Sequence, residues 1–544
     1  MVMLSALLPV RRALAHGFGE RFTLPVPLWL YLYGAAAAVV VSFVLVGMFV
    51  GESSRGDRYR RYNLLELSWV RGLVESRMVF VGLRLLSVLL FLLVLAAGLF
   101  GEQTPSLNFA PTFVWVTWWV GLGYLTAFVG NIWPLVNPWK ILFKAADGLA
   151  RRAGLSGGLE VREPYPRRWG VWPALLFYFA FVWVELVYEG SATPRNIAFL
   201  TLVYSLVTWT GMAWFGKEVW LRQGEVFSVF FDILARFAPT EVRVADLREC
   251  EECSGPCDYY LERPRSKKAR KRQFEVPNVE ADCVNCYECF RWAEPQHREL
   301  NVRPWAVGLS RREPITLDRL AFIVFMLASV TMDGLMATPL WGRVQAIFFP
   351  EAAVFGRPEN PAAHLLVQTL ALMALPALFL GVYYGFSLLI RVFGGVREHI
   401  TVVAAAFVYS LVPIALAYQV AHYYTLLLIQ GQNIVPLLFD PFGWGWNLFG
   451  TAAYRTTVGV VGARFVWYSQ VALIVIGRAV AVYLAHVIAL RMLGNSKRAV
   501  RSQYPMLVLM VLYTVSSLWV LAQPVVEESA APGAFLTPMF QLWS

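Results

Sequence analysis

Ten long apolar segments constrain the fold of this chain more than any other feature. Each is long enough to cross the ~30 Å hydrocarbon core of a bilayer as a helix. The sequence therefore predicts an all-α integral membrane protein with about ten transmembrane helices. The segments are 28–50, 78–100, 109–130, 170–188, 197–216, 318–340, 363–390, 400–428, 466–490 and 505–524.

The distribution of charge supports this interpretation and predicts an orientation. Charged residues are 15% of the chain, against about a quarter in a soluble protein. Alternate segments between the apolar windows carry 36 and 8 lysines and arginines. Because basic loops stay in the cytoplasm, we expect both termini outside and the long loop after the fifth helix inside. Membrane insertion then accounts for most of the net charge of +11, and no nucleic acid partner is needed.

The same reading divides the chain into tails, two groups of helices and a cytoplasmic insertion. Aromatic residues after residue 216 recur at near-helical spacing among charged ones. This pattern predicts an amphipathic helix on the cytoplasmic surface, or alternatively a helix packed on the bundle. Asn, Pro and Trp clusters at 131–140 predict a broken or re-entrant segment. The predicted units are 1–27 (extracytoplasmic tail), 28–216 (helices one to five), 217–239 (interfacial amphipathic helix), 240–315 (cytoplasmic cysteine-rich metal module), 316–528 (helices six to ten) and 529–544 (extracytoplasmic tail).

All six cysteines fall within 40 residues of the long loop, as C-x2-C-x3-C followed by C-x2-C-x2-C. Two-cluster ferredoxins repeat C-x2-C-x2-C-x3-C, and each fourth cysteine binds the other cluster. In that alignment Leu247 and Ala293 replace two ligands of the same cluster. One cluster is therefore lost and one [4Fe–4S] cluster is complete, as in a remnant of a ferredoxin. Its predicted ligands are Cys257, Cys283, Cys286 and Cys289.

Zinc is the alternative metal. Two C-x2-C pairs at this separation are typical of a tetrahedral structural site. This arrangement leaves Cys257 and Cys289 without a metal to bind. Disulfide bonds are not expected, because the cytoplasm keeps thiols reduced. The alternative zinc ligands are Cys250, Cys253, Cys283 and Cys286.

A basic run from Arg263 to Arg272 separates the two cysteine groups. Near the cytoplasmic leaflet such a run gains ~1 kcal/mol per charge from anionic lipid. We therefore expect it to contact anionic lipid or an acidic partner protein.

Ionisable residues inside apolar segments are functional candidates because their burial in lipid is costly. Asp333 and Arg478 lie deep in their segments, and we expect them to form a direct or water-linked pair. Glu185 and His422 lie nearer the outer surface. His422 and His486 fall near opposite membrane faces, so they cannot share one iron, and this spacing disfavours haem.

Five stretches resemble an uncharacterised family of polytopic prokaryotic membrane proteins, some of which are labelled "fenitrothion hydrolase". The resemblance implies a polytopic protein of a prokaryotic plasma membrane. No metal-hydrolase ligand set or nucleophile in this sequence matches the label, so the resemblance does not imply hydrolase activity. The stretches are 15–21 (AHGFGER), 24–34 (LPVPLWLYLYG), 224–239 (GEVFSVFFDILARFAP), 329–341 (SVTMDGLMATPLW) and 411–424 (LVPIALAYQVAHYY).

These features predict a membrane subunit of a redox complex, acting in electron transfer for an oxidoreductase. Its cytoplasmic [4Fe–4S] cluster would relay electrons between a soluble partner and a membrane acceptor such as quinone, with Asp333 and Arg478 handling protons. One alternative is a transporter or proton-coupled channel with a structural zinc module, in which residues 131–140 also line the path. Another is a scaffold whose basic loop docks a catalytic partner.

Overall fold

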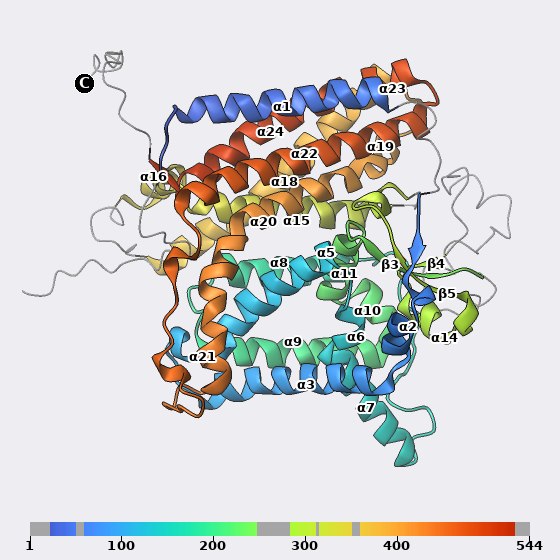
Figure 1. The fold of residues 1–544 in the computed structure, drawn as a ribbon, viewed down its shortest axis with the longest axis vertical. Helices are drawn as coiled ribbons and strands as arrows, with labels where there is room; N and C mark the ends of the chain where they lie inside the picture. Colours follow the sequence, from blue (N-terminus) through green and yellow to red (C-terminus); the bar gives the residue numbers. More distant parts are fainter. Residues whose placement is uncertain (1–21, 51–58, 247–282, 312–314, 351–359, 528–544) are drawn as a thin grey trace, which may run out of the picture.

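The computed structural model describes residues 22–50, 59–246, 283–311, 315–350 and 360–527. Most of these residues are helical, and the long helices lie side by side (Figure 1). Eight helical segments are long and apolar enough to cross a membrane. They are α1 (Leu28–Phe49), α3 (Arg77–Phe100), α9 (Pro194–Phe215), α15 (Leu317–Met336), α18 (Pro361–Gly394), the run Ile400–Phe439 with α19 (Ile400–Phe407), α20 (Val412–Ile429) and α21 (Ile434–Phe439), α22 (Ala463–Leu493), and the run Ser496–Ala522 with α23 (Ser496–Ser502) and α24 (Tyr504–Ala522).

The two remaining apolar windows are helical as well, but differ from regular spans. The window 170–188 contains α8 (Trp172–Leu186), which has 15 residues. The window 109–130 contains α4 (Phe109–Pro111), a π-helical stretch at Thr112–Gly121, and α5 (Leu122–Phe128). The wider turns of a π-helix change the direction of the side chains around the helix axis. Within this stretch, the consecutive residues Trp118 and Trp119 both contact the Phe227 ring.

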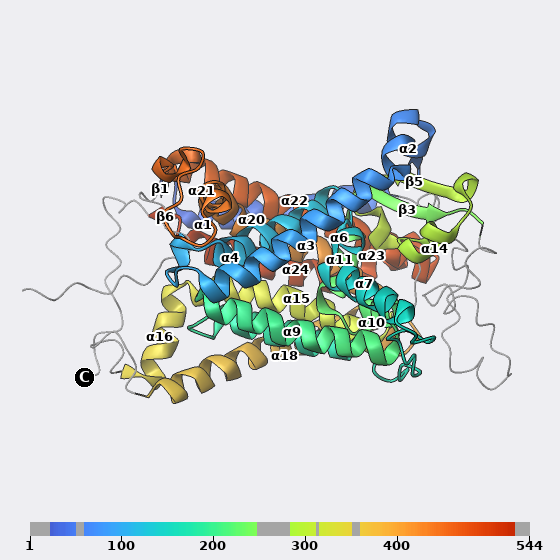
Figure 2. The ribbon, with the colours of Figure 1, turned by 90° about the horizontal axis from the view of Figure 1, so that it is seen from below.

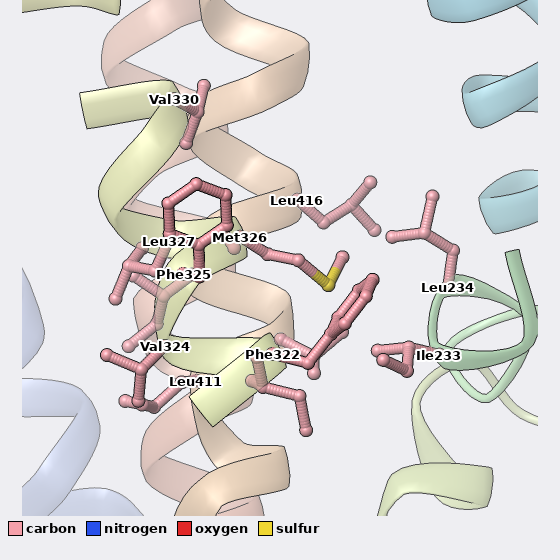
Figure 3. Close-up of a cluster of buried hydrophobic side chains, with 14 of the residues drawn as sticks. Ile233, Leu234, Phe322, Val324, Phe325, Met326, Leu327, Val330, Leu411 and Leu416 are labelled. Carbon is pink, nitrogen blue, oxygen red and sulfur yellow. The ribbon is translucent and has the colours of Figure 1, made fainter. Parts of the chain in front are cut away.

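Helices α15 and α20 form the centre of the bundle. They pack against each other, α15 also contacts α8 and α18, and α20 contacts α22. Figure 3 shows their shared core, in which Met326 and Leu416 point toward Leu234 of α11 (Val226–Ala235). Large apolar side chains on the outer helices are exposed instead, as expected for contact with lipid. They include Phe49, Leu89, Leu366 and Leu512.

The predicted surface helix at 217–239 differs from the observed structure. This segment forms α10 (Lys217–Gln223) and α11, and eight of the ten residues of α11 are buried. Phe227 contacts the Trp118 ring edge-to-face, with the ring centroids 4.6 Å apart. Only Ser228 and Asp232 of α11 are less than fully buried, and this burial favours the alternative of a helix packed on the bundle.

The predicted break near residues 131–140 is present. Helix α5 ends at Phe128, and two helices follow, α6 (Trp133–Val136) and α7 (Pro138–Arg152). Asn137 separates them and caps α7, because its side-chain oxygen accepts a hydrogen bond from the Lys140 amide at 3.0 Å. The chain therefore changes direction at the end of the bundle.

A small antiparallel sheet lies at that end of the bundle (Figure 1, Figure 2). Its strand order is β2 (Tyr62–Asn63), β5 (Arg298–Val302), β3 (Thr240–Val244), β4 (Cys283–Val284). Strand β2 comes from the first loop, so the module uses more of the chain than the predicted 240–315. At the opposite end, β1 (Phe22–Thr23) pairs in parallel with β6 (Val526–Glu527). The other helices of eight or more residues are α2 (Ser68–Glu75) and α16 (Pro339–Phe348).

Candidate metal centre and carboxylate cavity

Three cysteines converge beside the edge of the small sheet. Cys283 begins β4, Cys286 immediately precedes α14 (Tyr287–Trp292), and Cys289 lies within α14. Their Sγ atoms all lie within 4.8 Å of one another. This part of the predicted ligand set is therefore brought together, whereas Cys250, Cys253, Cys257 and the basic run 263–272 lie outside the described residues.

The local sequence explains how the three thiols meet. Cys283 pairs with Val244 in the sheet, and Asn285 then turns the chain with a φ of 58°. Asn adopts this left-handed conformation more readily than most residues. The Asn285 amide donates to the Val242 carbonyl at 2.8 Å. The tight turn brings Cys286 and the start of α14 back beside Cys283.

The thiols lie in a small apolar cluster with Val244 and Ala293. Cys283 and Cys289 are buried, and Cys286 is half-buried. Ala293 stands where a ferredoxin run would place its last cysteine, and it is buried in this same cluster. Because alanine cannot bind a metal, a fourth protein ligand would have to come from another part of the chain.

The three thiols fit a metal centre by their chemistry and convergence. A single Zn²⁺ ion bound at ~2.3 Å by tetrahedral thiolates holds the sulfurs about 3.8 Å apart. The cysteines of a [4Fe–4S] cluster bind different irons, so their sulfurs lie farther apart. The observed separations are nearer the single-ion value, and a cluster would require the cysteine side chains to rotate outward.

The cysteine module is tied to the broken segment of the bundle. The Tyr287 hydroxyl donates to the Asn131 carbonyl, and the Thr240 hydroxyl donates to the Val129 carbonyl. Burial is the main cause that raises the pKa of Tyr287, followed by the nearby Asp232 carboxylate. Tyr287 therefore stays neutral and serves as a hydrogen-bond donor at this contact.

A buried ion-pair network fixes the sheet to the same end. The Glu241 carboxylate accepts hydrogen bonds from Arg303, from Arg61 at 2.6 Å, and from the Tyr59 hydroxyl at 2.6 Å. Arg303 also donates to the carbonyls of Ala235 and Ala238, just after α11. The C-terminal end of α11 is thereby linked to β3 and to the first loop.

A second candidate site, the carboxylate cavity, lies near the other end of the bundle. Glu185 of α8 and Asp333 of α15 both line it. It has room for one water molecule at most. Two carboxylates that line one small cavity repel each other when both are ionised, so the cavity favours a bound proton or cation. Its lining residues are Trp119, Tyr178, Val182, Glu185, Leu186, Ser329, Val330, Asp333, Gln419 and Tyr423.

Two neighbours on α20 hold Asp333 in place. The His422 Nε2 atom lies 2.9 Å from the Asp333 Oδ2 atom, and the Tyr423 hydroxyl donates to the same oxygen. The His422 side chain is 6% exposed and that of Asp333 is 21% exposed. Asp333, His422 and Glu185, all candidates from the sequence, therefore belong to one cluster.

Of the direct or water-linked pair expected between Arg478 and Asp333, the direct contact is not formed. The Arg478 Nη2 atom donates to the Ser517 hydroxyl at 3.2 Å, and its guanidinium lies 4.3 Å from the centre of the Tyr513 ring. Among the described residues it makes no ion pair, and its Nε and Nη1 atoms have no partner. The Tyr513 hydroxyl shares a hydrogen bond with Thr331, which links Arg478 to α15.

Comparisons with protein-family models, curated proteins and solved structures gave no match.

Several members of the carboxylate cavity were not predicted. Tyr423 and Gln419 lie within the stretch 411–424, and Ser329 lies within 329–341. Both stretches are among the five that resemble the membrane protein family. That resemblance was the indication in the sequence that these residues could belong to a site. The buried pair of Glu241 and Arg303 had no comparable indication.

Proposed function

We propose that this protein is the membrane subunit of a redox complex and carries one thiolate metal centre at the cytoplasmic end of its helical bundle. The observation that supports a metal centre is the convergence of Cys283, Cys286 and Cys289 on a module anchored to the bundle, and the cysteine spacing is what favours a cluster there. The C-x2-C-x2-C spacing is that of iron–sulfur proteins. A [4Fe–4S] cluster, when bound, supplies one-electron transfer.

The residues of the chain would have distinct roles in this assembly. Cys257 would complete the ligand set, and the half-buried Cys286 offers the side from which a soluble partner approaches. Asp333 lies about 24 Å along α15 from its first residue, at 1.5 Å per residue. Electrons would therefore enter at one end of the bundle, while protons for an acceptor such as a quinone would be held near the other end.

Metal analysis and EPR of anaerobically purified full-length protein test the proposal. We expect about four irons per chain and an EPR signal on reduction. Cys257→Ser and Cys289→Ser should both abolish the signal, because each removes one of four ligands. Cys250→Ser and Cys253→Ser are the matched controls and should keep it. Stoichiometric zinc without iron would overturn the redox function.

A transporter or proton-coupled channel with a structural zinc module is the second candidate. The close spacing of the three sulfur atoms favours it, since one ion draws its ligands nearer together than a cluster does. The two-carboxylate cavity would then be part of a proton path. The same cysteine variants separate the two functions, because zinc would be lost in Cys250→Ser and Cys253→Ser and kept in Cys257→Ser.

A further inference from the structure

Two cavities meet at Gln419 in the middle of the bundle. Gln419 lines the carboxylate cavity and also a second cavity, here called the inner cavity. The inner cavity lies between α11 and the central pair α15 and α20, where Leu234, Met326 and Leu416 point toward one another (Figure 3). It too has room for one water molecule at most. Its lining residues are Gly123, Tyr124, Phe230, Leu234, Met326, Ala415, Leu416 and Gln419.

The walls of the inner cavity are otherwise nearly apolar. The Tyr124 hydroxyl donates to the backbone carbonyls of Gln419 and Val420, at 3.1 and 3.2 Å. The Gln419 side chain makes no hydrogen bond to any residue in the described part of the chain. The half-buried Gln419 amide can donate to and accept from water. Water in the two cavities would satisfy it, and this is the role we infer for them.

A charged cluster lies on the opposite side of α11 from the inner cavity. Phe230 and Leu234 line that cavity, whereas Asp232 lies between them in sequence and faces away, and Arg236 follows the last residue of the helix. Asp232 pairs with Arg236 at 3.4 Å and with Arg319 of α15 at 4.0 Å. This charged cluster therefore lies outside the lining of the inner cavity.

We propose that the two cavities form a hydrated proton path that ends at Glu185 and Asp333, with Gln419 at its narrowest point. The inference rests on the proposed function in one respect, namely that these carboxylates hold protons. The Gln419 amide would bridge the two waters, since it can donate to one and accept from the other. A proton could then move between the cavities without an open channel.

Infrared spectroscopy of the full-length protein in liposomes tests this path through hydrogen exchange. A protonated carboxyl in the cavity gives a carbonyl band that shifts when D₂O replaces H₂O, and Asp333→Asn and Glu185→Gln assign that band. We expect Gln419→Leu to slow the exchange that shifts this band roughly tenfold. A tenfold change in rate corresponds to the loss of one hydrogen bond of ~1.4 kcal/mol from the path. Met326→Phe, which fills the inner cavity from the opposite wall, should slow it as well.

The control is Gln470→Leu. Gln470 is a buried glutamine on α22 that donates to the Ala421 carbonyl at 3.0 Å and lines neither cavity. Its variant should exchange at the wild-type rate. An unchanged rate in Gln419→Leu, or equal slowing in Gln470→Leu, would overturn the path but leave the metal centre untouched. Absence of any band that depends on Asp333 or Glu185 would instead remove the proton-holding role from the proposed function.

Discussion

Glu241 joins the cysteine module to the bundle through a single buried carboxylate. Burial alone would raise the pKa of Glu241, but the Arg303 guanidinium, the Tyr59 hydroxyl and Arg61 together lower it below its ordinary value. A carboxyl whose pKa is lower in the folded than in the unfolded protein stabilises the fold above its unfolded pKa. That contribution is lost as the pH falls through the folded-state pKa.

We therefore expect the sheet to loosen in acid. Hydrogen exchange at β3 and β5, corrected for its intrinsic pH dependence, should be slow at neutral pH and accelerate below the ordinary glutamate pKa of ~4.3. Glu241→Gln should lower the free energy of opening of both strands by about 3–5 kcal/mol already at neutral pH. The reason is that the substitution leaves buried arginine charge unpaired.

Glu299→Gln provides the comparison on the same two strands. Glu299 pairs with Arg243 at 2.8 Å, and both side chains are partly exposed. Such a pair contributes less than ~1 kcal/mol. If the two variants loosened the strands equally, the assignment of the docking role to Glu241 would be wrong.

Single residues also show where inference from the sequence stops. The cysteine spacing predicted that Cys283, Cys286 and Cys289 would meet, because local spacing fixes local geometry. Depth along a helix predicted that Asp333 and Arg478 would pair, yet Asp333 contacts His422. A rise of 1.5 Å per residue gives the depth of a side chain but not the direction in which it points, so its partner could not be predicted.

Among the elements, α11 depends on the buried carboxylate at its N-cap. The Glu225 side chain accepts hydrogen bonds from the backbone amides of Phe227 and Ser228, at 3.0 and 2.8 Å, and from the Tyr204 hydroxyl. The indole of Trp133 donates to it at 3.4 Å. This one side chain therefore connects α11, α9 and the broken segment.

Glu225→Ala should destabilise the protein by roughly 2–4 kcal/mol, since it removes a cap and leaves several buried donors unsatisfied. Thermal unfolding in detergent, followed by tryptophan fluorescence, measures this loss. Glu218→Ala on the neighbouring α10 is the matched control. Glu218 pairs with Lys140 at 3.1 Å near the surface, so its loss should cost less than ~1 kcal/mol. Equal losses would contradict the role given to Glu225.

The interpretation of 217–239 as a surface helix failed at the level of the element. Aromatic residues at near-helical spacing suggested one apolar face, but Val226, Val229 and Ile233 complete the other sides. Ser228 and Asp232 form only a narrow polar strip on this helix, which is too little to face water along its length. The break at 131–140 was predictable because proline and asparagine act locally, through a missing amide and a side-chain cap.

For the whole molecule, the distribution of basic residues predicts which end of the bundle faces the cytoplasm. Alkaline phosphatase fused after Trp446 should be active, because this loop lies at the end expected outside. The same enzyme fused after Ser310 should be inactive, and green fluorescent protein should give the reverse pattern. The opposite result at both positions would place the cysteine module outside and exclude a cytoplasmic redox partner.

Hydropathy predicted the helical bundle well, because a run of apolar residues can be recognised in the sequence without knowing which residues pack against it. All ten windows are helical, and eight contain helices long enough to cross a membrane. The small sheet was not predicted. Strand β2 has two residues and pairs with a segment far along the chain, and so short a strand has no periodicity to detect.

The packing of α1 has a consequence for biogenesis. This helix contacts α22 and α24, and the strand that precedes it pairs with β6 after α24. During translation α1 leaves the ribosome long before α22 begins at Ala463. It must therefore wait in the bilayer, or beside the insertion machinery, until the last helices arrive and pack against it.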